Sequence, residues 1–173
     1  MSAPAEASPS TEANNDDFLK FCEEIDSPGH ILSPADFVHL HNHTHYSLLD
    51  GLTKVPDLIK YVKETGMQAV AVTDHGTMSS LIELYKEGQS AGIKPILGLE
   101  AYVAARNRTD KDPAHDKVRY HITLLAMNDQ GFENLCRLAT EAEINGKYYK
   151  PRIDHEIMGK YNEGIICLSG CAS

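Results

Sequence analysis

Apolar segments of two kinds alternate along most of this chain, and this alternation is what most limits its possible folds. Residues 55–66 (VPDLIKYVKETG) have apolar side chains at helical spacing and end in a glycine, as an amphipathic helix does. Residues 67–75 (MQAVAVTDH) instead form a continuous apolar run, which is typical of a strand buried on both faces of a parallel sheet. Strands that alternate with helices predict a parallel α/β architecture, either a closed barrel or an open sheet.

The same patterns predict the remaining elements. They are strands at residues 37–41, 94–104, 120–127 and 164–171, helices at residues 79–92 and 131–144, and polar loops at residues 106–117 and 146–154. The last strand (GIICL) has the composition of a strand buried on both faces, yet few residues follow it. We therefore expect the chain to be a piece of a longer protein.

Residues 1–36 differ from the rest of the chain in composition and charge. They hold eight acidic residues and one basic residue, and so contribute −7 of the formal net charge of −9. Their first 15 residues have almost no apolar side chains to bury, so we expect residues 1–36 to be a disordered or irregular acidic tail. The chain has 173 residues, which fits one domain, placed here at residues 37–173.

Several classes of protein are excluded by composition. No apolar run approaches the roughly 20 residues of a membrane span, and the N-terminus lacks the pattern of a secretory signal. Four cysteines without disulfide-type spacing indicate a reduced, cytoplasmic chain, in which we expect Cys22, Cys136 and Cys167 to be tail or core residues. The chain also lacks the basic stripe of a self-sufficient DNA-binding protein.

Histidines are concentrated at the start of the domain. His39, His41 and His43 alternate along one predicted strand and its exit, so all three are expected on one face. Imidazoles crowded on one face repel each other when protonated, and a shared metal ion removes that conflict. His45 continues the pattern, and it could face a substrate.

Further metal-competent side chains follow along the chain. They are Asp50, Asp74, His75, Glu100, His121 and Cys171. Of these, His75, Glu100 and Cys171, like His41 and His43, lie at the carboxyl ends of predicted strands, where parallel α/β folds place their ligands. His121 fits less well, because it lies near the start of its strand. Taken singly, Asp50 could be a turn residue, Asp74 a helix cap, Glu100 a surface acid and Cys171 a buried thiol. Together, nitrogen, oxygen and sulfur donors favour Zn²⁺, Mn²⁺ or Fe.

Mixed imidazole and carboxylate donors in this number suggest more than one ion. Two adjacent ions can stabilise both the attacking and the leaving oxygen of a phosphoester, so phosphoester hydrolysis is the reaction class that the donors favour. A metal-dependent amidohydrolase would use similar donors and stays open as the alternative at this point.

Six motifs resemble those of one known family. They are FVHLHNHTHYSLLDG, AVTDHG, GIKPILGLEAYV, YHITLLA, YYKPRID and LSGC, and together they span residues 37–173. The set resembles the PHP domain, and SLLDG, KPILGLEAYV and KPRID resemble in particular the PHP domain at the N-terminus of bacterial replicative DNA polymerase III α subunits. The resemblance implies an α/β fold of the (β/α)₇ type, a TIM-like barrel that would be incomplete here.

The resemblance also implies a metal centre. Matched position by position, the metal ligands of the family fall on His41, His43, Asp50, His75, Glu100, His121 and Cys171. The family uses nine ligands for up to three ions, and the last two, in a D-x-H pattern, lie beyond Ser173. No separate catalytic residue is assigned. His39 and Asp74 are expected to lie just outside the ligands, where they orient the imidazoles by hydrogen bonds or are structural neighbours of the site.

The family further implies a setting in DNA replication. The intact polymerase would act on DNA in the cytoplasm with a sliding clamp, a clamp loader and proofreading subunits, and its PHP domain would carry a metal-dependent phosphoesterase site of the 3′→5′ exonuclease type. Two alternatives stay open: a stand-alone, histidinol-phosphatase-like PHP phosphoesterase, and a non-catalytic PHP scaffold. Lys150 and Arg152 could meet phosphate or hold a loop, and His115 and His155 are expected to be exposed.

Overall fold

A computed structural model describes residues 33–170 of the chain, and the residues from Pro34 onward form one compact unit. The predicted disordered tail lies almost entirely outside the described residues. The elements are η1 (Pro34–Asp36), α2 (Val55–Glu64), β1 (Ala69–Val72), α3 (Leu81–Ala91), β2 (Lys94–Ala104), β3 (Arg119–Ala126), α4 (Asp129–Ile144), β4 (Arg152–Ile153), α5 (His155–Lys160) and β5 (Ile165–Leu168). No helix within this part of the chain is both long and apolar enough to cross a membrane.

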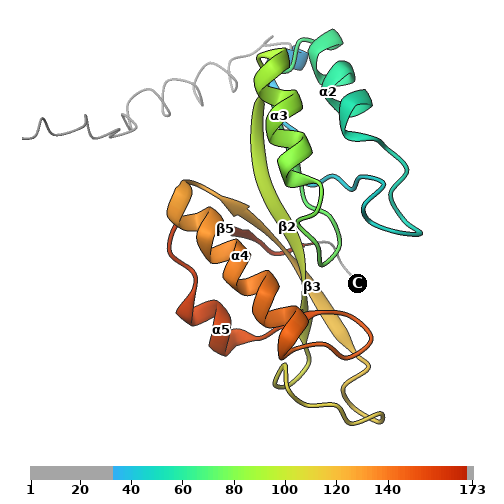
Figure 1. Ribbon diagram of the computed structural model, residues 1–173, viewed down its shortest axis with the longest axis vertical. Coiled ribbons are helices and arrows are strands. Elements are labelled where there is room, and N and C mark those ends of the chain that lie inside the picture. The colour runs from blue at the N-terminus through green and yellow to red at the C-terminus, as the bar shows by residue number, and fades with distance from the viewer. Residues whose placement is uncertain (1–32, 171–173) are drawn as a thin grey trace, which may run out of the picture. The chain divides into compact units, whose positions relative to one another are not determined.

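The five strands form one open sheet, which is the incomplete barrel expected from the sequence. Its order is β1-β2-β3-β5, with β4 paired to the far end of β2. The long strand β2 connects the two halves of the sheet, since its start pairs with β1 and its remainder pairs with β3 and β4. Figure 1 shows α2 and α3 beside the first half of β2, and α4 and α5 beside the second half.

The parallel arrangement predicted for the strands is wrong for two of the four strand pairings. β2 pairs with β1 and β4 in parallel, but β3 runs antiparallel to both β2 and β5. The reason is the connection between β2 and β3, which is a loop without a helix. A parallel pair needs a crossover connection, usually a helix, whereas a loop lets the chain turn back beside the strand that it has just left.

Two hydrophobic clusters hold the helices on the sheet. The first joins α2 and α3 to β1 through fully buried residues such as Val62, Val72 and Leu84. The second joins α4 and α5 to β2, β3 and β4 through Leu124 and Leu138, among others. These positions are the apolar faces that the sequence periodicity predicts.

Several predicted boundaries are confirmed and others are corrected. α3 ends at Ala91 and is capped by Gly92, whose positive φ of 74° is the left-handed conformation expected of a glycine cap. In contrast, the predicted strand at 37–41 amounts to a single bridge between His39 and Val70. The predicted loop at 146–154 contains β4, and the sequence pattern gave no sign of the helix α5 that follows, although its N-cap Asp154 accepts a hydrogen bond from the Ile157 amide.

The last strand is less buried than its composition suggests. Ile166 and Cys167 of β5 are both exposed, so the prediction of a strand buried on both faces is wrong, as is the placement of Cys167 in a core. Cys136 on α4 is also exposed. β5 pairs only with β3 among the described strands, which leaves its other edge uncovered there.

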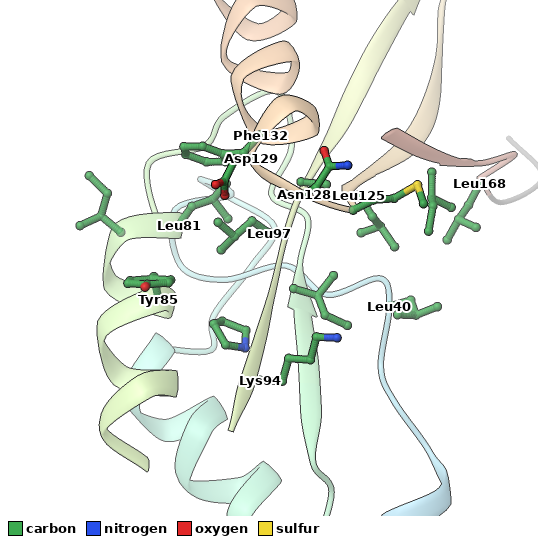
Figure 2. Close-up of a pocket in the computed structure, with 16 residues that line it drawn as sticks. Leu40, Leu81, Tyr85, Lys94, Leu97, Leu125, Asn128, Asp129, Phe132 and Leu168 are labelled. Carbon is green, nitrogen blue, oxygen red and sulfur yellow. The ribbon is translucent and has the colours of Figure 1, made fainter. Parts of the chain in front are cut away.

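An apolar pocket of about 810 Å³ lies between α3, the start of β2 and the ends of β3 and β5. Figure 2 shows Leu81 and Tyr85 of α3 on one side of it and Leu97, Leu125 and Leu168 of three strands on the other. Leu40, from the segment before the histidines, also lines this pocket.

Candidate metal centre

The candidate site lies on the face of β2 that points away from α4. Successive side chains of a strand alternate between its faces. Leu99 and Ala101 pack in the core beneath α4, so Glu100 and Tyr102 point to the opposite face. His75 joins them there, because a parallel bridge pairs it with Glu100 just beyond the end of β1.

The buried carboxylate of Glu100 meets three imidazoles. Only 3% of this residue is exposed, and its Oε2 atom contacts His41 Nε2 and lies 3.0 Å from His43 Nε2. Its other oxygen, Oε1, lies 3.0 Å from His75 Nδ1. A buried carboxylate requires a positive partner to offset its lost hydration, and protonated imidazoles or a metal ion can supply that charge.

Asp50 extends the cluster toward solvent. Its Oδ2 atom lies 2.6 Å from His75 Nε2, and the rings of His43 and His75 stack with centroids 3.9 Å apart. The donors therefore form two overlapping triplets, each with atoms within 4.8 Å of one another. The triplets are His41, His43 and Glu100, and His43, Asp50 and His75.

The protonation chemistry of the cluster suits a metal ion. Burial, and next the nearby His75, lower the pKa of His43, which favours the neutral imidazole that binds metals. The hydrogen bond from His75 lowers the pKa of Asp50, which favours the carboxylate. In addition, the buried Nδ1 atom of His43 forms no hydrogen bond among the described residues, and the contact of His75 Nδ1 with Glu100 Oε1 at 3.0 Å is not aligned as one. The residues therefore fit one or more divalent metal ions.

Asp74 fixes the loop that carries Asp50. This fully buried carboxylate accepts hydrogen bonds from the Thr44 amide and hydroxyl and from the hydroxyls of Ser47 and Ser80. Ser47 Oγ also accepts the backbone N–H of His75. Asp74 thus acts as a structural neighbour of the site, which it positions through hydroxyl groups and not through a hydrogen bond to an imidazole ring. Nothing in the local sequence marks Thr44, Ser47 and Ser80 for this role.

His121 reaches the same face of the sheet by a route that the sequence did not reveal. It pairs with Tyr102 across the antiparallel β2–β3 ladder, two positions from the pair of Glu100 with Thr123 and therefore on the same face. The start of β3 therefore lies beside the end of β2, which explains why a residue at a strand start belongs at this edge. Neither donor triplet of described residues includes His121.

Cys171 lies outside the described residues, but the chain that leads to it runs past His121. A Cβ atom built on Gly170 would lie 2.9 Å from the His121 carbonyl oxygen and 3.0 Å from its ring. The structure thus brings together five of the seven predicted ligands, and places a sixth on the same sheet face.

Arg152 and four further histidines also stand out in the sequence, and none of them joins the cluster. Arg152 is fully buried and donates to the backbone carbonyls of Gly146, Asp116, Arg108 and Asp110, so its role is to hold loops. The remaining histidines do not join the cluster. His39 contacts Phe37, His45 contacts Tyr46, and His115 and His155 are exposed as expected.

Comparisons with known proteins identify the family of the chain. Residues 39–173 match the family model described as PHP domain. The chain is 49% identical to DNA polymerase III subunit alpha of Thermus aquaticus over 143 residues, which are 80% of this chain and 12% of that protein. It is 46% identical to the Aquifex aeolicus protein of the same name over 142 residues, 79% of this chain and again 12% of the relative. The chain thus spans about an eighth of these relatives.

Among solved structures, an amidohydrolase from Chromobacterium violaceum aligns with a TM-score of 0.42 and 21% identity. The alignment covers 60% of this chain and 34% of that protein.

Proposed function

Because the chain belongs to the PHP domain family, we propose that its histidine and carboxylate cluster is a divalent metal centre for phosphoester hydrolysis. The proposed ligands are His41, His43, Asp50, His75, Glu100, His121 and Cys171, with Zn²⁺, Mn²⁺ or Fe as the ions. The observation that carries the proposal is the buried Glu100 carboxylate, which faces three imidazoles, while the buried Nδ1 atom of His43 forms no hydrogen bond among the described residues.

Each residue has a definite task in this proposal. Glu100 and Asp50 supply negative charge that favours a cation, and the imidazoles of His41, His43 and His75 supply nitrogen ligands. Asp74 and the hydroxyls that it binds keep Asp50 and His75 in place. When bound, divalent ions would polarise a phosphoryl oxygen and offset the charge that develops on the leaving oxygen.

We further propose that the chain is the N-terminal PHP domain of a bacterial DNA polymerase III α subunit. The identities of 46–49% with two such subunits support this assignment, which concerns only the part that this chain covers. DNA synthesis, a cytoplasmic location and the clamp, clamp-loader and proofreading partners would then be properties of the intact polymerase. A 3′→5′ exonuclease activity would belong to the PHP domain of that protein.

Metal binding tests the centre directly. The wild-type chain and the Glu100→Gln and His43→Ala variants would be titrated with Zn²⁺ and Mn²⁺ by calorimetry. We expect the wild type to bind, and each variant to lose at least tenfold in affinity, since both residues contact other ligands of the cluster. His115→Ala removes an exposed imidazole outside the cluster and should bind as the wild type does. Equal affinities for all variants would contradict the proposal.

Activity tests the reaction class and separates the alternatives. In the intact protein, His41→Ala should abolish metal-dependent degradation of DNA from its 3′ end while it spares nucleotide addition. An unchanged nuclease rate would refute the assigned site. Metal binding without any hydrolysis would favour a non-catalytic scaffold, and hydrolysis confined to a small phosphomonoester such as histidinol phosphate would favour the stand-alone phosphoesterase.

A further inference from the structure

A group of cationic and aromatic side chains adjoins the metal centre without belonging to it. Tyr102 stacks on the imidazole of His75, with ring centroids 6.1 Å apart and planes 18° apart. Two cations lie over this tyrosine ring, the Arg119 guanidinium at 5.6 Å and the Lys150 ammonium at 5.7 Å. Tyr102 therefore connects a ligand of the cluster to two positive charges from β3 and from the loop before β4.

The group continues away from the metal centre. Arg119, Lys117 and Tyr149 line a shallow hollow of about 270 Å³, and the Lys117 ammonium lies 6.0 Å above the Tyr149 ring. The Tyr149 side chain is 67% exposed, and its φ of 60° is the left-handed conformation that non-glycine residues seldom adopt. A large ring is thus presented to solvent at a position that costs backbone strain.

The cations of this surface have no acidic partners among residues 33–170. Arg106, Arg108 and Arg137 all form ion pairs with carboxylates, and the Arg152 guanidinium donates its hydrogen bonds to backbone carbonyls. Arg119, by contrast, donates only to the Lys117 carbonyl oxygen, and neither Lys117 nor Lys150 forms an ion pair within this range. In a chain of net charge −9, a local group of unpaired cations favours an anionic ligand from outside.

We propose that Tyr102, Lys117, Arg119, Tyr149 and Lys150 form a strand-binding face for single-stranded nucleic acid. Cations that follow the phosphates, combined with an exposed ring on which a base can stack, are the two features by which proteins bind single strands. In a duplex the base faces are already stacked, so Tyr149 would have no partner there. The strand-binding face would lead the phosphodiester at the end of the strand toward His75 and the metal centre.

This proposal rests on the proposed function, since it names the form of phosphoester that would reach that site. Its test measures binding and not hydrolysis. A fluorescent oligothymidylate would be titrated with the 173-residue chain by anisotropy at several salt concentrations. The Arg119→Gln/Lys150→Gln double variant should bind at least tenfold more weakly. Its salt dependence should be shallower by about 1.4 in log–log slope, which is about 0.7 for each phosphate that the variant no longer neutralises.

Two further comparisons make the result specific. Lys63→Gln/Lys86→Gln removes the same charge from exposed positions on α2 and α3 and should bind within twofold of the wild type. Tyr149→Leu should weaken binding about fivefold or more without a change in salt slope. Tyr149→Phe should bind as the wild type does, because stacking needs only the ring. Equal loss in the two double variants, or tighter binding of a duplex than of the single strand, would overturn the proposal.

Zinc titrations of the same variants separate this inference from the proposed function. We expect the Arg119→Gln/Lys150→Gln variant to bind Zn²⁺ as the wild type does. If the chain binds the oligonucleotide through these residues but binds no Zn²⁺, the metal centre is refuted and the strand-binding face stands. If it binds Zn²⁺ but the oligonucleotide result is independent of Arg119 and Lys150, only the strand-binding face is refuted.

Discussion

Asp74 shows how a single buried side chain organises the candidate site. Its carboxylate accepts four hydrogen bonds, from Thr44, Ser47 and Ser80, and solvent cannot replace any of them. Asp74→Asn would replace one acceptor oxygen by an NH₂ group that faces hydrogen-bond donors. We expect a loss of about 2–3 kcal/mol in the free energy of unfolding, measured by urea denaturation. Asp57→Asn, an exposed residue of α2, is the control and should change stability by less than about 0.5 kcal/mol.

Gly131 is a residue at which local helix preference and tertiary packing disagree. It lies in the first turn of α4, and a Cβ atom there would approach the Gly164 carbonyl oxygen to 1.8 Å. Gly131→Ala should therefore lower the free energy of unfolding by about 2 kcal/mol, although alanine favours helices by about 1 kcal/mol. Gly159 in α5 has no atom near its Cβ position, so Gly159→Ala should stabilise by about 0.5–1 kcal/mol. Thermal unfolding of both variants measures these effects. Equal shifts in the unfolding temperature of the two variants would contradict the prediction.

At the scale of elements, the loop between β2 and β3 is held together by charge. Asp116 is buried and accepts two hydrogen bonds from the Arg106 guanidinium, at 2.9 and 2.6 Å, and one from the Asp112 amide. The Arg106 hydrogen bonds lower the pKa of Asp116 from 3.8 to about 2. This loop also contributes carbonyls to the buried Arg152, so its conformation affects how β4 pairs with β2.

The pH dependence of stability follows from that shift. A carboxyl group whose pKa is lower in the folded state stabilises the fold above its unfolded pKa, and this stabilisation is lost as the pH falls toward the folded pKa. The wild type should therefore exceed Asp116→Asn in free energy of unfolding above about pH 4, and the difference should shrink between about pH 4 and pH 2. Urea denaturation across this range measures it. A difference that is constant from neutral pH to about pH 2 would show that the charge of Asp116 is irrelevant.

At the scale of the molecule, the described sheet leaves apolar surface uncovered. β5 pairs with β3 alone, its Ile166 side chain is 45% exposed, and the apolar pocket of Figure 2 opens beside it. Uncovered strand edges and apolar patches promote association between copies of a chain. We expect this chain to self-associate with rising concentration, as light scattering coupled to size exclusion would show. Ile166→Lys should reduce the association, whereas Ile144→Lys, at an exposed position on α4 outside the pocket, should not. A chain that stays monomeric at all concentrations would contradict this.

The sequence by itself determined most elements and the family. Periodicity depends only on neighbouring residues, so α2, α3, β2, β3 and α4 could be predicted closely, β1 was predicted in place but too long, and the motifs correctly indicated a PHP domain. The side chains of the candidate centre were also visible, because His41, His43, His75 and Glu100 are unusual donors in otherwise apolar surroundings. Short elements such as β4 and α5 could not be predicted, since two to six residues carry too little periodic signal.

Only the tertiary structure decided how these pieces meet. Strand direction depends on pairing between residues far apart in the chain, so the antiparallel β2–β3 pair, which brings His121 to the edge that holds Glu100, could not be read from local patterns. The roles of Arg152 and Asp74 also depend on residues far away in the sequence. Arg152 became a loop anchor and Asp74 the support of the metal loop because burial leaves each no partner except the groups around it. Local sequence sets which groups are available, and long-range packing sets which of them face each other.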